Sequence, residues 1–245
     1  MLKKVFSEFG YRLNSLSAET FFSDGVFLVE GTSEVLFYTA LAEELGLDTD
    51  RHNVSILSVE GVGFKPYVAI CNALNIPWIL RTDNDIFSKP KNAPTKKYYA
   101  GITRIMGIIE EIGDCDTGLI AYWKSNSDQI EWPKDDDIPV EAEKLKQYVG
   151  TAAEALGVFL SDIDLENDLV NSEIFADLSL FYGEKDHEAI VKRMQKKKAE
   201  NMLSFLSEHH DKLGKLKDNK IFEPLSKLIT TITEKTRPNN DKRTN

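Results

Sequence analysis

Short apolar runs alternate with amphipathic segments in the first third of the chain. Apolar runs occupy residues 26–29, 54–59 and 76–80, and each has the length and composition of a buried strand. Between them, residues 33–45 and 65–74 place apolar side chains on one face, which is typical of helices. Strands that alternate with helices of roughly ten to fifteen residues predict βαβ units, and therefore an α/β fold with a parallel sheet flanked by helices.

The middle of the chain has a less regular pattern. Residues 86–97 are rich in Pro, Asn and Lys and predict a loop, whereas residues 98–113 show helical spacing. The short apolar stretch at 118–123 favours a further strand. Residues 125–139 contain a run of three aspartates and predict an exposed excursion.

Helices dominate the rest of the predicted structure. One brief strand is expected at 158–160, leading into the acidic segment 161–166. Helices are expected at 140–156, 172–182, 187–213 and 221–234, before a frayed end at 236–245. The expected parts are an N-terminal linker (1–24), an α/β domain (25–170) with an insertion at about 86–157, and a basic helical subdomain (171–245).

Composition limits the class of protein, and charge limits its partners. The chain has 245 residues, of which 42% are hydrophobic, so it can bury a sizeable core and is neither disordered nor fibrous. Its formal net charge is −10. Residues 1–184 carry 15 basic and 31 acidic side chains, whereas residues 185–245 carry 15 and 9. Any nucleic-acid site must therefore be local, and the basic C-terminal part is either a solvated helical face or a phosphate-binding surface.

Several functional classes are excluded by missing motifs. Cys71 and Cys115 are the only cysteines and lie far apart, and the four histidines lack zinc-ligand spacing, which argues against a disulfide framework and a structural zinc site. The chain has no phosphate-binding loop, dinucleotide fingerprint or nucleophile elbow. It also has no apolar run near the ~20 residues that span a bilayer, and no signal peptide. We therefore expect a soluble cytoplasmic protein that does not enter membranes.

Acidic residues follow three of the predicted strands. Glu30 follows the first strand, Asp83 and Asp85 follow the third, and an acidic cluster follows the strand at 158–160; that cluster contains Asp162, Asp164 and Glu166. The carboxyl ends of parallel strands lie at one edge of a sheet, where ligands bind. Carboxylates gathered there repel one another unless a cation neutralises them, and Mg²⁺ or Mn²⁺ suits such oxygen ligands.

Each of these residues also has a simpler interpretation. A single acid after a strand is often a turn or helix-cap residue, and Glu34 alone would be a favourable charge in the first turn of a helix. Lys192, in a predicted helix, could stabilise the negative charge that develops on a phosphate during cleavage, or it could be an ordinary surface lysine. The run Lys196–Lys198 could follow a nucleic-acid backbone or form a solvated face.

Two segments carry a family resemblance. Residues 21–34 (FFSDGVFLVEGTSE) and 80–85 (LRTDND) resemble the Toprim domain of OLD (overcoming lysogenisation defect) nucleases, which include the nuclease subunit of the Gabija antiphage system. The resemblance is strong over residues 17–85. Beyond them it is looser, and there Asp162–Glu166 and Lys192 are matched to the family's acidic segment and late lysine.

The resemblance implies a Toprim (Rossmann-like) fold and a DNA endonuclease that uses two divalent ions, Mg²⁺ or Mn²⁺, in antiphage defence. Catalysis would depend on Glu30, Asp83, Asp162 and Lys192. Asp162 and Glu166 are the preferred members of the third acidic cluster, with Asp164 in reserve. The metal ligands it implies are Glu30, Glu34, Asp83, Asp85, Asp162, Asp164 and Glu166.

The expected partners also come from the resemblance. They are DNA, an ABC-type ATPase domain in cis or in trans, a helicase by analogy with Gabija, and a second copy of the chain when the ATPase part is attached. The ATPase domain of the full-length family has no counterpart in this sequence. Alternatives that keep the fold are topoisomerase-like or primase-like chemistry, RNA cleavage, and a catalytically idle assembly module.

Overall fold

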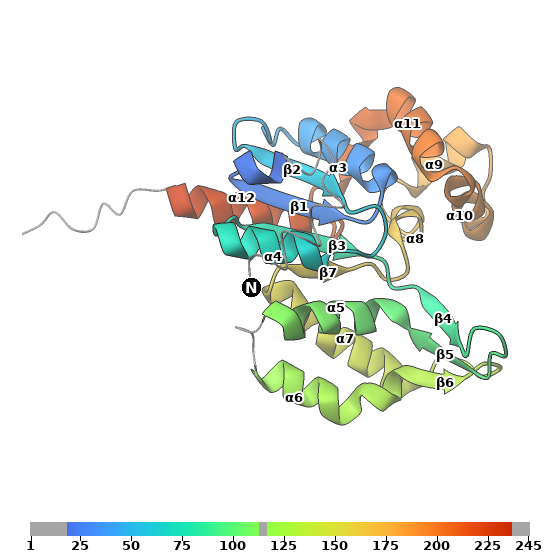
Figure 1. Ribbon diagram of the computed structural model, residues 1–245. Helices are drawn as coiled ribbons and strands as arrows, with labels where there is room; N and C mark the ends of the chain where they lie inside the picture. Colours follow the sequence, from blue (N-terminus) through green and yellow to red (C-terminus); the bar gives the residue numbers. More distant parts are fainter. Residues whose placement is uncertain (1–18, 113–116, 237–245) are drawn as a thin grey trace, which may run out of the picture.

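A parallel sheet forms the centre of the molecule (Figure 1). The computed structural model describes residues 19–112 and 117–236. Residues 1–18 of the predicted linker, Cys115, and residues 237–245 of the frayed end predicted at 236–245 lie outside these residues. After the short 3-10 helix η1 (Glu19–Phe22), the strands of this sheet are β1 (Gly25–Val29), β2 (Val54–Ser58), β3 (Trp78–Thr82) and β7 (Val158–Leu160). Within the described chain they form a four-stranded sheet in the order β2-β1-β3-β7, and every pairing is parallel, so the predicted fold class is confirmed.

Both faces of the sheet are buried. Successive side chains of a strand point to opposite faces, and β1 is apolar at every position after Gly25. Val26 and Leu28 join a core with α4 (Lys65–Leu74), α5 (Ala100–Ile112) and α7 (Val140–Ala155). Phe27 and Val29 join a second core on the other face. The helices of that core include α3 (Thr32–Glu44), α8 (Leu165–Val170), α11 (Lys198–His209) and α12 (Glu223–Thr236).

A second, antiparallel sheet lies in the segment between β3 and β7. Its strands are β4 (Ile86–Lys89), β5 (Lys96–Tyr99) and β6 (Glu131–Pro133), and η2 (Ser127–Ile130) precedes β6. The predicted loop at 86–97 is therefore wrong, because most of it forms a hairpin. The predicted strand at 118–123 is also wrong, since these residues lie in α6 (Thr117–Asn126). The predicted exposed excursion contains Trp132, which is buried with its ring centroid 5.2 Å from that of Tyr99.

The C-terminal part is helical, as predicted, but it is divided more finely. It contains α9 (Phe175–Tyr182), α10 (His187–Lys196), α11, η3 (His210–Leu216) and α12. The single helix predicted at 187–213 breaks at Lys197, which has a non-helical backbone (φ −148°, ψ 66°). The break lets α11 start in a new direction at Lys198. None of the described helices combines the length and the apolar character that crossing a bilayer requires.

Candidate active site at the carboxyl ends of the strands

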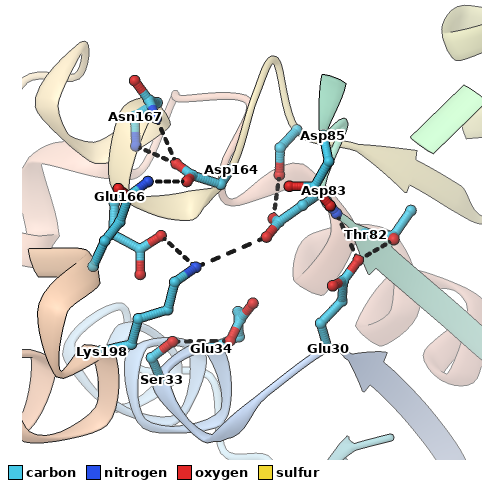
Figure 2. A network of polar contacts seen from close by, with 12 residues as sticks. Glu30, Ser33, Glu34, Thr82, Asp83, Asp85, Asp164, Glu166, Asn167 and Lys198 are labelled. Carbon is cyan, nitrogen blue, oxygen red and sulfur yellow. Dashed lines mark hydrogen bonds and ion pairs between the residues drawn. The ribbon is translucent and has the colours of Figure 1, made fainter. Parts of the chain in front are cut away.

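Acidic residues meet where three neighbouring strands end (Figure 2). Glu30 directly follows β1, and Asp83 and Asp85 follow β3. Asp164 and Glu166 lie at the start of α8, which follows β7. The strand order β1-β3-β7 therefore brings together acids that are more than a hundred positions apart in the sequence.

The carboxylate of Glu30 is held on one side only. Its Oε1 accepts hydrogen bonds from the backbone N–H of Asp83 (3.0 Å), from Thr82 Oγ1 and from Arg104 Nη1 (2.6 Å). Its Oε2 accepts no hydrogen bond from any described residue. Figure 2 shows this second oxygen turned toward the space between Glu34, Asp83 and Lys198. Glu30 thus presents Oε2 to the centre of the site as an oxygen that can bind a metal ion.

Asp83 is the most perturbed acid of the site. It is 7% exposed, and its Oδ1 accepts a hydrogen bond of 3.3 Å from Ser161 Oγ. Burial, together with repulsion by Glu30 and Glu34, raises the pKa of Asp83 to about 8. Glu34, in the first turn of α3, is also buried and accepts a hydrogen bond of 2.9 Å from Ser33 Oγ. Asp83 and Glu34 are therefore buried close to other acids, and the charged form of Asp83 is disfavoured there.

Lys198 lies between Asp83, which follows β3, and Glu166, at the start of α8. Its Nζ lies 2.9 Å from Glu166 Oε2 and 4.0 Å from Asp83 Oδ2. Burial acts to lower the pKa of Lys198, but Glu166 and Asp83 outweigh it and raise this pKa above its usual value, so the amine stays protonated. Glu166 is 1% exposed, and burial raises its pKa. The ammonium group thus neutralises part of the carboxylate charge that a bound metal ion would otherwise neutralise.

The other acids predicted for the site have different surroundings. The Asp85 side chain is 38% exposed, and its Oδ2 lies 3.5 Å from Arg104 Nη2. Asp164 caps α8: its Oδ1 accepts from the backbone N–H of Asn167 (2.8 Å), and its Oδ2 accepts from Gln195 Nε2 (2.6 Å). The Asp162 side chain is 91% exposed and is 3.9 Å from Lys146 Nζ. Glu30, Glu34, Asp83 and Glu166 are instead linked to one another, because Glu30 and Glu34 act on Asp83, and Lys198 lies near both Asp83 and Glu166.

Lys192 lies on the surface of α10. Its side chain is 73% exposed, and its Nζ lies 3.2 Å from Glu188 Oε2 one helical turn away. No hydrogen bond or ion pair of the described residues joins it to the acids of the site. Two cations that do reach the acids, Lys198 and Arg104, were not assigned to the site from the sequence. Lys198 belongs to a noted lysine run, whereas no motif distinguishes Arg104.

The chemistry of this donor set fits a hard divalent cation. Carboxylate oxygens are the ligands that Mg²⁺ and Mn²⁺ prefer. Burial and then the nearby Glu30 raise the pKa of Asp83, and a bound cation would favour its carboxylate form. As arranged in residues 19–112 and 117–236, no three acidic, histidine or cysteine side chains already form a metal-binding group. The ammonium of Lys198 stands between Asp83 and Glu166 instead.

Known proteins resemble the segment that contains several of these acids. Residues 21–85 match the family described as "Overcoming lysogenization defect protein-like, TOPRIM domain". The matched segment contains Glu30, Glu34, Asp83 and Asp85. This segment of the chain therefore resembles an OLD-like TOPRIM domain. Over 208 residues it is 29% identical to Endonuclease GajA of Bacillus cereus (strain VD045), and this alignment covers 80% of the chain and 33% of GajA. The chain thus spans about a third of the length of this relative.

Two solved structures share the fold of this chain. The C-terminal region of the Xanthomonas campestris pv. campestris OLD protein, phased with platinum, matches with a TM-score of 0.50 and 21% identity, covering 89% of this chain and 97% of that one. The same region phased with mercury gives a TM-score of 0.50 and 20% identity, with 88% and 99% covered. The expected resemblance to OLD proteins is confirmed.

Proposed function

We propose that this OLD-like TOPRIM chain is the catalytic part of a divalent-metal-dependent DNA endonuclease that acts in antiphage defence. The observation that carries the proposal is the meeting of Glu30, Glu34, Asp83 and Glu166 around one protonated lysine at the carboxyl edge of the sheet. Groups that repel one another are kept together at little benefit to stability unless they bind a cation. The relation to an endonuclease supports cleavage of a phosphodiester bond.

The acids have distinct tasks in this proposal. Glu30, Glu34, Asp83, Asp85 and Glu166 would hold Mg²⁺ or Mn²⁺, and we expect two ions. When bound, such ions lower the pKa of water and offset charge on phosphate oxygens. The protein keeps Glu30 and Asp83 in fixed orientations through the hydrogen bonds of Thr82, Ser161 and the Asp83 backbone N–H. We leave Asp162 and Asp164 out of the ligand set, because Asp162 is exposed and Asp164 uses both oxygens within the protein.

We assign to Lys198 the role that the family resemblance gave to Lys192. Lys198 Nζ already lies among the acids, whereas Lys192 pairs with Glu188 on an exposed helix face. A protonated amine beside Asp83 can donate to a nonbridging oxygen of the scissile phosphate and stabilise the charge that grows there during hydrolysis. Its raised pKa keeps it in the donating form at neutral pH.

The remaining expected partners are part of the same proposal. GajA is about three times as long as the aligned segment, so an ATPase part in cis or in trans, a helicase and a second copy of the chain stay predictions. The chain's own site contributes the carboxylates and the lysine. A partner would therefore affect how DNA is presented and not the chemistry of cleavage.

The test is cleavage of supercoiled and linear plasmid in Mg²⁺, in Mn²⁺ and in excess chelator. We expect nicked or linear products with metal, none with chelator, and none with Asp83→Asn, which keeps the side-chain shape and removes the charge. Asp211→Asn, at an exposed position outside the site, is the matched control and should cleave like the natural protein.

The products separate the alternatives. Relaxed circles without strand breaks would favour topoisomerase-like chemistry, and cleavage of RNA in a parallel reaction would favour a ribonuclease. Failure to cleave any nucleic acid, together with failure to bind Mn²⁺, would overturn the proposed function and favour an assembly module.

A further inference from the structure

One arginine reaches the acids from outside the TOPRIM-matching segment. Arg104 belongs to α5, in the segment between β3 and β7, and its side chain is only 11% exposed. Its Nη1 lies 2.6 Å from Glu30 Oε1 and donates to the backbone carbonyl of Asp83 at 2.9 Å. Nη1 also contacts Thr82 Oγ1, and Nη2 lies 3.5 Å from Asp85 Oδ2. A single guanidinium therefore contacts Thr82 at the end of β3, the Asp83 backbone, and the carboxylates of Glu30 and Asp85.

The contacts on Glu30 are one-sided. Three donors, the Asp83 N–H, Thr82 Oγ1 and Arg104 Nη1, converge on Oε1, while no described residue donates to Oε2. A carboxylate held in this way cannot rotate freely, and it offers only Oε2 to a ligand. Hydrogen bonds of this kind to a metal-binding carboxylate orient it and tune its affinity.

Arginine suits this place better than lysine does. A planar guanidinium has several N–H donors in fixed directions, so it can hold Glu30, the Asp83 carbonyl and Asp85 at the same time. Lys198 contacts a different part of the cluster, Glu166 and Asp83 Oδ2. The two cations therefore have separate partners.

We propose that Arg104 is a positioning residue of the metal site: it fixes Glu30 through Oε1, leaves Oε2 for a divalent cation, and ties Asp85 to the same arrangement. The inference rests on the proposed function, because the cation is the one that the carboxylates would bind for cleavage. Because Arg104 belongs to α5, this helix would then help to position the metal ligands.

Binding of Mn²⁺ to the full chain tests this without any need for activity. Free Mn²⁺ is followed by electron paramagnetic resonance while metal is added to the protein. For Arg104→Ala we expect an affinity lower by about 10–100-fold, the range typical for loss of a residue that orients a metal ligand. Arg104→Lys keeps the charge and one contact, so an intermediate affinity is expected. In cleavage assays, half-maximal rate should need correspondingly more Mn²⁺, with the KM for DNA at saturating metal unchanged.

Two further variants control for charge and folding. Thr82→Val removes a second donor to Oε1 without changing charge, and a smaller loss of Mn²⁺ affinity is expected. Arg193→Ala removes an arginine that donates to the Tyr182 carbonyl on another part of the surface, and it should bind Mn²⁺ like the natural protein. Thermal melting without metal identifies any variant that does not fold, and Arg104→Lys carries the test if Arg104→Ala fails this check.

The outcomes are distinct. If the natural protein binds Mn²⁺ and cleaves DNA while Arg104→Ala and Arg104→Lys bind Mn²⁺ with unchanged affinity, the positioning role is wrong and the proposed function stands. Tighter binding by Arg104→Ala also overturns the role, because Arg104 would then compete with the cation for Glu30. A natural protein that binds no Mn²⁺ overturns both proposals.

Discussion

Two lysines of the same basic segment differ in what surrounds them. Lys198 lies among buried acids, and Lys192 lies on an exposed helix face. We predict that Lys198→Ala lowers the cleavage rate at saturating Mn²⁺ and DNA by about 10²–10³-fold, the usual effect of removing one donor to a developing oxyanion. Lys192→Ala is the matched control, with a change below about twofold, as expected for an exposed ion pair. A large loss with Lys192→Ala and none with Lys198→Ala would contradict the assignment.

Asp164 illustrates an acid whose oxygens are used by the protein itself. It caps α8 and accepts from Gln195, so both oxygens are engaged. We predict that Asp164→Ala lowers the free energy of unfolding by about 1 kcal/mol, the typical cost of removing an N-cap, and leaves Mn²⁺ affinity unchanged. Urea denaturation and Mn²⁺ titration measure the two quantities.

The control for this variant is Asp186→Ala. Asp186 caps α10 by accepting from the backbone N–H of Ala189 at 2.8 Å, so its removal should cost a similar amount of stability. A drop in Mn²⁺ affinity with Asp164→Ala and not with Asp186→Ala would return Asp164 to the ligand set.

The contact between α5 and the chain after β3 depends on a glycine. A Cβ added to Gly101 would lie 2.5 Å from the Asp83 carbonyl oxygen and 2.7 Å from the Asn84 Cα, and neither backbone atom can move alone. We predict that Gly101→Ala destabilises the protein by about 1–3 kcal/mol, as overpacking does, and lowers cleavage by displacing Asp83. Chemical denaturation and the plasmid assay check the two effects.

Gly107 on the same helix is the matched control. A Cβ there would meet only the end of the Lys65 side chain, at 3.7 Å. Gly107→Ala should therefore stabilise the helix by up to about 1 kcal/mol, because alanine has the higher helix propensity. Equal effects of the two substitutions would show that α5 does not approach the loop after β3 as closely as described.

The strands of the main sheet were predictable because each is mostly an apolar run between clear turns. Only β3 is displaced, from the predicted 76–80 to Trp78–Thr82, since its last two residues are polar yet buried: Arg81 pairs with Asp168, and Thr82 contacts Glu30. The β4-β5 hairpin was missed because β4 is exposed throughout and has no apolar alternation. Residues 118–123 of α6 were predicted as a strand, because an apolar stretch of six residues is too short to distinguish the helical period of about 3.6 residues from the strand period of two.

The acids of the site were predictable because parallel strands end at one edge, so Glu30 and Asp83 had to approach each other. Arg104 could not be predicted, since its approach depends on how α5 packs against the main sheet. Lys198 could not be separated from its neighbours, because the helix break at Lys197, absent from the predicted helix at 187–213, decides which lysine faces inward.

The whole molecule carries net negative charge, yet its proposed substrate is a polyanion. The junction of α10 and α11 is basic, because exposed Lys192, Lys196 and Lys197 precede Lys198 of the site. These lysines would attract DNA phosphates locally, next to acids whose charge bound metal ions would neutralise. DNA affinity should therefore depend on this junction more than on net charge.

We predict that reversing these three lysines to glutamate weakens DNA binding and lowers its salt dependence. Each phosphate that the variant no longer neutralises should reduce the slope of log K against log salt by about 0.9 for duplex DNA. The control reverses Lys124, Lys212 and Lys235, which lie in α6, η3 and α12 and give the same change in net charge. Fluorescence anisotropy in Ca²⁺ at several salt concentrations measures both triple variants. A steeper loss of affinity for the junction variant assigns the phosphate-binding surface to α10 and α11, because a purely global effect of charge would weaken both variants equally. Equal weakening of both variants would contradict the prediction, and only residues around the acids would then be expected to contact the DNA.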